Sequence, residues 1–292
     1  MAKKFIFQIT GGIGKCIAST GVIKGIKENY PDHELIVISG YPDVYIGNPN
    51  VSKSFAFNQI TYFYEDHIAN NDIVVLCNDP YLETGFIRQD KHLIEVWYDM
   101  ARMEYKGQKP ELFLSEREKQ FNLTKIQSDK PLFFLQSNGG ADGQPLKYSW
   151  ARDIPSSIVT KIIEHYSPNY NIVHIRRQDQ IAYNGTILLN DDFRNVASLM
   201  TFSTKRLFID SFAQHTASAL NLPSTVLWIA NKPEVFGYDL HTNIVANPET
   251  KTPELKNSFL NKYDISGNPL QFPYNSEDEI FDIDKIIEAI GE

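Results

Sequence analysis

Three short segments of the 292-residue chain combine small, polar and basic residues in patterns that suit anion binding. They are TGGIGKC at 10–16, QSNGGADGQPLKYSW at 136–150 and DSFAQHTASALNLP at 210–223. Small residues let the backbone approach a ligand closely, and free N–H groups at a helix start favour an anion or a hydroxyl group. The chemistry that these segments suggest first is therefore the binding of a phosphate-containing molecule.

The glycine-rich segment at 10–16 matches neither of the two common nucleotide loops. A P-loop requires Ser or Thr where the chain has Cys16, and the dinucleotide pattern requires a third glycine where it has Ile17. What remains is a strand-to-helix turn that contains Gly11, Gly12 and Gly14. A ligand-binding turn and a plain tight turn are equally compatible with it.

The segment at 210–223 is more informative. Asp210 ends a predicted strand, and Ser211 is placed to cap the helix that follows. His215 falls in the first turn of this helix, where the helix dipole favours a diphosphate. In the segment at 136–150, Lys147 is placed to act as a phosphate counter-ion. The alternatives are a surface histidine on a capped helix and a solvated lysine.

Short apolar runs alternate with helical patterns along the chain, as in a parallel sheet covered by helices. Strands are predicted at 5–10, 34–40, 72–78, 131–137, 171–176, 186–190, 206–210 and 224–229. Helices are predicted from 13 to about 26 and at 90–105, 155–166, 192–201 and 213–221. The charged stretch 105–130 separates the two halves and is expected to be partly helical after Ser115. The fold class is therefore α/β, with two Rossmann-type domains facing a central cleft.

These patterns predict an N-terminal domain with its linker at 1–128 and a C-terminal domain at 129–275. A last helix is predicted within 276–292, because Ser276 and Glu279 have capping-box spacing and isoleucines follow at helical intervals. In open parallel sheets, ligands bind beyond the carboxyl ends of the strands. The three segments follow such strand ends, so they are expected to meet in the cleft.

Composition narrows the classes of function. The formal charge of −8 argues against a nucleic-acid partner, and 42% hydrophobic residues are enough for a sizeable core. The two cysteines, Cys16 and Cys77, lie in apolar runs and are expected to be buried, with no disulfide or metal site. No apolar run is long enough for a membrane helix, so a cytoplasmic protein is expected, and peripheral membrane contact stays possible.

The three segments together resemble glycosyltransferase family 9, the heptosyltransferase family, which has the GT-B fold. DSFAQHTASALNLP is similar to that family's nucleotide-diphosphate loop, DSG-x-x-H-x-x-A-A-L-x-x-P, and is the specific match. GGIGKCIASTGVIKGIKENYP at 11–31 resembles its first loop and helix, and PELFLSEREKQ at 110–120 its linker. Lys147 with Trp150 resembles a K-x-W-P phosphate-binding stretch, with one extra residue and no proline.

The resemblance implies a metal-independent transferase without a cofactor, which moves a sugar from a nucleotide-diphosphate sugar to a hydroxyl of a glycan or glycolipid. The N-terminal domain, with its glycine loop, would hold the acceptor, and the last helix would pack back on that domain. The base or ribose of the donor would lie near Tyr183 or the loop 176–180. The donor-binding residues implied are Ser137, Asn138, Lys147, Asp210, Ser211, Phe212, Ala213 and His215.

The chain departs from the family at the position of the proposed general base, where it has Lys15 in place of an acid. Transfer to a hydroxyl needs a base to take the proton. Another carboxylate is one solution, and Asp79 and Glu83 are the candidates, since both follow a predicted strand end. Otherwise Lys15 binds an anionic acceptor, or catalysis has been lost. The alternative functions are a non-catalytic sugar-nucleotide or glycan-binding protein and a sugar-nucleotide epimerase.

Overall fold

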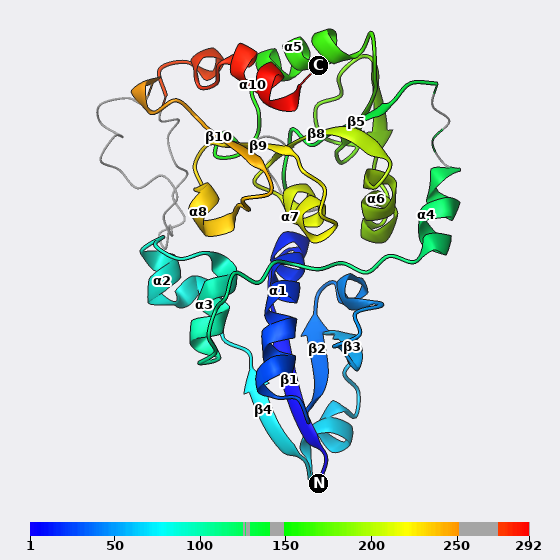
Figure 1. Cartoon of the computed structure of the whole chain (residues 1–292), viewed down its shortest axis with the longest axis vertical. Helices are drawn as coiled ribbons and strands as arrows, with labels where there is room; N and C mark the ends of the chain where they lie inside the picture. The colour runs from blue at the N-terminus through cyan, green and yellow to red at the C-terminus, as the bar shows by residue number, and fades with distance from the viewer. Residues whose placement is uncertain (125, 127–128, 141–148, 251–273, 292) are drawn as a thin grey trace.

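A computed structural model describes residues 1–124, 126, 129–140, 149–250 and 274–291. Two sheets, both entirely parallel, form the centres of two domains that follow one another in the chain (Figure 1). The carboxyl end of the first sheet points toward the second domain, and the linker runs across the boundary between them. This arrangement confirms the predicted α/β fold class with two Rossmann-type halves.

The first sheet has the strand order β3-β2-β1-β4. Its strands are β1 (Lys3–Ile9), β2 (Glu34–Ser39), β3 (Lys53–Ala56) and β4 (Asp72–Leu76). The helical elements of this half are α1 (Ile13–Asn29), η1 (Pro42–Tyr45), η2 (Tyr64–Ile68), η3 (Pro80–Leu82), α2 (Thr84–Ile87) and α3 (Leu93–Met100). The central strands β1 and β2 are almost wholly buried, as expected for parallel strands covered on both faces.

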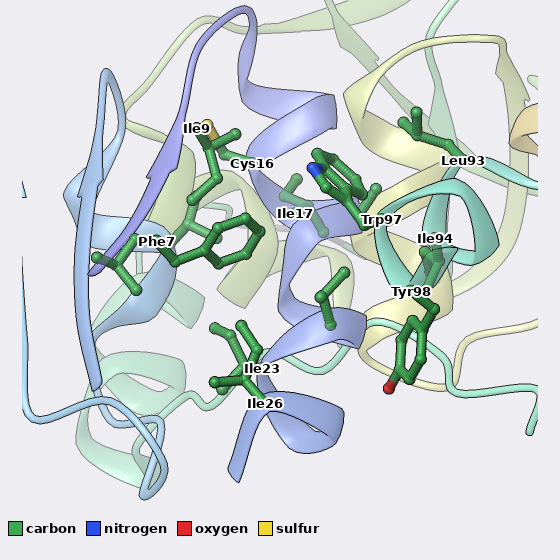
Figure 2. Close-up of a cluster of buried hydrophobic side chains, with 14 of the residues drawn as sticks. Phe7, Ile9, Cys16, Ile17, Ile23, Ile26, Leu93, Ile94, Trp97 and Tyr98 are labelled. Atoms are coloured by element: carbon green, nitrogen blue, oxygen red, sulfur yellow. The ribbon is translucent and has the colours of Figure 1, made fainter. Parts of the chain in front are cut away.

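Helices α1 and α3 pack together over one face of the first sheet. Figure 2 shows Phe7 and Ile9 of β1 beside α1, together with Trp97 and Tyr98 of α3. Tyr98 donates a hydrogen bond of 3.1 Å to the carbonyl of Gly21. A Cβ atom at Gly25 would lie only 2.3 Å from the Tyr98 hydroxyl, so glycine is required for this close approach.

The second sheet has six strands in the order β10-β9-β8-β5-β6-β7. The strands are β5 (Leu132–Leu135), β6 (Asn171–Ile175), β7 (Thr186–Leu189), β8 (Ser203–Ile209), β9 (Thr225–Trp228) and β10 (Thr242–Val245). The helical elements are α5 (Ser156–Tyr166), α6 (Phe193–Met200), α7 (Phe212–Ala219), α8 (Pro233–Phe236), η4 (Pro248–Thr250), η5 (Glu277–Glu279) and α10 (Ile283–Ile290). The predicted strands of both halves are present, each within a few residues of its expected range.

The linker contains α4 (Glu116–Leu123), which begins in a full capping box formed by Ser115 and Glu118. The same Glu118 accepts hydrogen bonds of 2.6 and 3.1 Å from the guanidinium of Arg194 on α6. Arg194 also donates to the carbonyls of Asp43 and Phe113, so one side chain joins the first domain, the linker and the second domain. An apolar cluster that contains Trp97 of the first domain and Trp228 of the second also crosses the boundary.

The last helix does not pack where the family resemblance implied. The Tyr166 hydroxyl of α5 lies 3.2 Å from the Ile287 carbonyl, and Lys205 of β8 donates to the Ile290 carbonyl. Helix α10 therefore packs on the C-terminal domain, with Ile286 fully buried. Its cap is Asp282, whereas Ser276 caps only the short turn η5, so the predicted capping box with Glu279 is wrong.

Cys16 is buried as expected, but Cys77 is exposed because it follows β4, an edge strand of the first sheet. None of the described helices is both long and apolar enough to cross a bilayer.

Candidate donor site in the interdomain cleft

A cavity of about 590 Å³ lies between the two domains at the carboxyl ends of their strands. This volume is within the range of small-molecule sites. From the first domain, the cavity is lined by Gly12, Ile13, Gly14, Lys15, Tyr41 and Tyr81. From the second domain, it is lined mainly by residues that follow β5, β6, β7, β8 and β9. The structure thus brings together strand ends that are as far apart in the sequence as Ile9 of β1 and Trp228 of β9, as parallel topology requires.

The amino ends of α1 and α7 meet at this cavity. A Cβ atom on Gly14, in the first turn of α1, would lie 3.0 Å from Cδ2 of His215 and 3.4 Å from Cα of Phe212. The caps of both helices leave their backbone donors available, because Gly12 has no side chain to cap α1 and the Ser211 side chain does not cap α7. The first N–H groups of a helix have no partner within it.

Two positive helix ends therefore lie close together in one cleft. Each carries about half a positive charge, and an anion between them would offset their mutual repulsion. Ser211 occupies the cap position that was predicted, but its hydroxyl is 3.2 Å from Nε2 of Gln136, whose amide donates to it. The predicted capping hydrogen bond is absent, so no side-chain cap occupies the first N–H groups of α7. Phe212 lines the cavity, whereas Ala213 is fully buried behind it.

His215 lies in the first turn of α7 with only 5% of its surface exposed. Its Nδ1 lies 2.8 Å from the hydroxyl of Tyr238. Burial, together with the nearby His92 and His241, lowers the pKa of His215 to about 3. The imidazole is therefore neutral at physiological pH, and it lines the cleft as a hydrogen-bonding group rather than as a cation.

Lys15 and Asp79 form an ion pair beside the cavity, with Nζ 2.7 Å from Oδ1. The Lys15 side chain is only 4% exposed. Its ammonium group lies 4.2 Å from the centre of the Tyr81 ring, and the face of an aromatic ring attracts a cation. Burial raises the pKa of Asp79, but hydrogen bonds from Lys15 and the Tyr81 N–H outweigh it and hold the pKa below its ordinary value. Asp79 is therefore a carboxylate at neutral pH, with a third of its side chain exposed.

Asp79 itself is not among the residues that line the cavity, and neither is Glu83, the other predicted candidate for the base. Glu83 precedes α2 as its cap residue, and its side chain makes no capping hydrogen bond there. Asp43 also follows a strand of the first sheet, yet its carbonyl takes part in the domain contact with Arg194. Of these three carboxylates, Asp79 is the one in contact with residues that line the cleft.

The predicted donor residues of the second domain divide into two groups. Asn138, Asp210, Ser211, Phe212 and His215 line the cavity. Ser137 is fully buried, with its hydroxyl 2.8 Å from Nε2 of His174, and the Ala213 side chain is buried in the core. Burial raises the pKa of Asp210, which accepts a hydrogen bond from Asn231. Lys147 lies outside the described residues.

Sequence reasoning missed several residues that line the cleft. Three of them are Gln136, which directly follows β5, Arg152, which precedes α5, and Asn231, which follows β9. Arg152 comes two residues after Trp150 and is the described cation closest in sequence to the predicted Lys147. Of the residues expected near the base or ribose of the donor, Arg176 and Arg177 line the cavity, whereas Tyr183 contacts Ser156 and His174 instead. Within the described residues, no group of three His, Cys, Asp or Glu side chains could hold a metal ion.

Comparison with solved structures gives several matches over most of the chain. The glycosyl transferase family 9 structure from Veillonella parvula has a TM-score of 0.68 and 12% identity, with 98% of this chain and 95% of that one covered. E. coli ADP-heptose lps heptosyltransferase II has a TM-score of 0.63 and 14% identity, with coverage of 83% and 89%. E. coli heptosyltransferase WaaC, solved with ADP, has a TM-score of 0.55 and 11% identity, with coverage of 84% and 93%.

No protein-family model matches the sequence, and no curated protein matches it. The structural likeness, at these low identities, establishes the fold: the chain has the GT-B-like fold of family 9 glycosyltransferases. The resemblance that the sequence motifs indicated is thereby confirmed at the level of fold.

Proposed function

We propose that this protein is a glycosyltransferase that moves a sugar from a nucleotide-diphosphate sugar to a hydroxyl of a glycan or glycolipid. The donor would bind to the second domain and the acceptor to the first. The observation that carries the proposal is the meeting of the amino ends of α1 and α7, through Gly14 and Phe212, in a 590 Å³ cleft. The fold it shares with heptosyltransferases supports the same function.

The diphosphate of the donor would lie between the two helix ends. Backbone N–H groups of Phe212 and Ala213 would bind its oxygens, and Arg152, which lines the cleft, would supply a cation. The sequence motif adds Lys147 as a second proposed counter-ion. As the bond from the sugar to the diphosphate breaks, negative charge develops on the leaving oxygens. Donors that are already oriented toward that charge stabilise the transition state without rearrangement. These residues would supply the charge neutralisation that a metal ion supplies in other transferases.

The acceptor hydroxyl must lose its proton during the transfer. Lys15 donates hydrogen bonds in its ion pair and so cannot take that proton. Its partner Asp79 is ionised and partly exposed, so we assign the base to Asp79 and the positioning of that carboxylate to Lys15. The acid has thus moved from α1, where the family resemblance expects it, to the segment after β4.

The experiment measures donor binding and turnover separately. Calorimetry with ADP-glucose, UDP-glucose and GDP-mannose identifies the nucleotide, and release of the nucleoside diphosphate in the presence of a glycan panel measures transfer. Asp79→Asn should lower the turnover by about 10²- to 10⁴-fold, as loss of a general base does, while donor affinity stays within about threefold. Glu83→Gln and Asp43→Asn are matched controls and should keep full turnover.

Two results would contradict this proposal. If none of the nucleotide sugars binds at millimolar concentration, the donor site is wrong. If Asp79→Asn keeps its turnover and its fold, as judged by circular dichroism, the assignment of the base is wrong. Tight donor binding without turnover against any acceptor would instead identify a binding protein on this scaffold.

A further inference from the structure

We propose that Tyr238 is a positioning residue that fixes the tautomer of His215, placing its proton on Nε2 so that an N–H donor faces the amino ends of α1 and α7. Tyr238 lies after α8, in a segment that carries none of the motifs discussed above. The tautomer belongs to the protein itself. Only the identity of the ligand that receives the hydrogen bond rests on the proposed function.

The positions of the protons follow from the hydrogen-bonding partners of the two side chains. The Tyr238 hydroxyl is buried and lies 2.8 Å from Nδ1 of His215, its single hydrogen-bond partner among the described residues. A buried hydroxyl that donates to nothing is costly. If Nδ1 carried the proton, the hydroxyl hydrogen would have no acceptor. Tyr238 therefore donates to Nδ1, and the neutral imidazole carries its proton on Nε2.

Gln214 does not disturb this arrangement. Its Nε2 lies 3.2 Å from Nδ1 and 3.1 Å from Nε2 of His215, and such equal distances place the amide over the ring rather than in line with either nitrogen. The same amide donates to the carbonyl of Phe236 at 3.0 Å. The in-plane lone pair of Nδ1 is thus left to Tyr238.

The Nε2 edge of the ring faces α1. A Cβ atom on Gly14 would lie 3.0 Å from Cδ2 and 3.5 Å from Nε2 of His215, so this edge points at the meeting of the two helices. The ionisable groups around the pair are His92 from the start of α3, His241 beside Gln214, and Asp210 and Tyr105 near Tyr238. Burial of the imidazole is the main cause that disfavours a second proton on His215, and the two neighbouring histidines add to it.

The chemical consequence is that His215 acts as a neutral donor. A cationic histidine would bind a diphosphate more weakly as the pH rises through its pKa, whereas a neutral Nε2–H donor keeps its strength. The charge of the diphosphate is then matched by the helix ends and by Arg152, which lines the same cleft. Tyr238 keeps the histidine in the form that can donate.

The first test reads the tautomer directly in the free protein. Long-range ¹H–¹⁵N correlation spectra of histidine-labelled protein distinguish protonated from unprotonated ring nitrogens, and His215→Gln assigns the signals. We expect an unprotonated Nδ1 and a protonated Nε2 in the wild type, and averaged nitrogen signals in Tyr238→Phe. Tyr98→Phe, which removes another buried hydroxyl in the same apolar cluster, should leave the His215 signals unchanged. A proton on Nδ1 of the wild type would overturn the proposal.

The second test uses the nucleotide sugar that binds best among ADP-glucose, UDP-glucose and GDP-mannose, whose diphosphates do not titrate near neutrality. Tyr238→Phe should weaken its binding about three- to tenfold, the effect of one neutral hydrogen bond. His215→Gln retains a donor near the position of Nε2 and should bind better than His215→Asn. Affinity that is flat from pH 6 to 8 supports the neutral donor, and a fall of about tenfold per pH unit contradicts it. If no nucleotide sugar binds, the proposed function fails, while the spectra still decide the tautomer.

Discussion

The junction between Arg194 and Glu118 offers a quantitative test of how the two domains are held together. Glu118 accepts two hydrogen bonds from Arg194, at 2.6 and 3.1 Å, and the same guanidinium donates to carbonyls of the first domain and the linker. We consider the replacement Glu118→Gln, which keeps the shape of the side chain and removes its charge. The matched control is Glu116→Gln on the same helix, whose carboxylate pairs with Lys119 but is 80% exposed.

The size of the effect follows from the ionisation of Glu118. The hydrogen bond from Arg194 is the main cause that lowers its pKa from the ordinary 4.5 to about 2. At about 1.36 kcal/mol for each unit of pKa, this lowering sets an upper limit of roughly 3.4 kcal/mol on what the ionised Glu118 contributes to the free energy of unfolding. One third of the side chain is exposed, so solvent screening reduces the expected loss to about 1–2 kcal/mol at pH 7. The control should change stability by less than about 0.5 kcal/mol.

Urea unfolding at several pH values measures this difference. A group whose pKa is lowered by folding stabilises the protein above its unfolded pKa, and the stabilisation is lost as the pH falls toward the folded pKa. The difference between wild type and Glu118→Gln should therefore be full at pH 7 and should narrow as the pH falls from 5 toward 3. A loss equal to that of Glu116→Gln, or a difference independent of pH, would refute this account of the domain junction.

Two further predictions concern the cleft and its histidines. Gly14→Ala should push the amino ends of α1 and α7 apart, lower the unfolding free energy by about 1–2 kcal/mol and weaken nucleotide-sugar binding. The control Gly40→Ala, outside the cleft lining, adds a Cβ atom that meets nothing within 4 Å and should do neither. Urea unfolding and calorimetry measure both effects, and equal effects of the two variants would contradict the close approach at Gly14. Burial lowers the pKa of His92 and His241 to about 4 and that of His215 to about 3. The free energy of unfolding should therefore fall as the pH drops below about 6.5, by up to roughly 4 kcal/mol per pH unit for the three histidines together. His241→Gln should reduce this slope by about a third in urea titrations, and an unchanged slope would show that His241 does not contribute.

The strands that sequence patterns identified are those with continuous apolar runs, such as β1, β5 and β9. The two strands that were missed, β3 and β10, are edge strands whose residues are only half-buried, so they lack such a run. The last helix was recognised from its isoleucine stripe, but the stripe does not say which domain it covers. Its partner on α5, Tyr166, is more than 110 residues away in the sequence.

The site was predictable where it is local and unpredictable where it depends on the fold. The glycine turn and the start of α7 each carry a sequence signal of their own, and both line the cleft. The pairing of Lys15 with Asp79 joins residues 64 positions apart, and it depends on β4 lying beside β1, which no local pattern specifies. The contact of Tyr238 with His215 likewise depends on how the segment after α8 packs against α7.

The most direct test of the central claim is a crystal structure of the protein with the nucleoside diphosphate that it binds best. The account predicts the two phosphates between the amino ends of α1 and α7, within hydrogen-bonding distance of the Phe212 and Ala213 N–H groups and beside Gly14. Phosphates bound elsewhere in the cleft, with the N–H groups of α7 facing water, would contradict it.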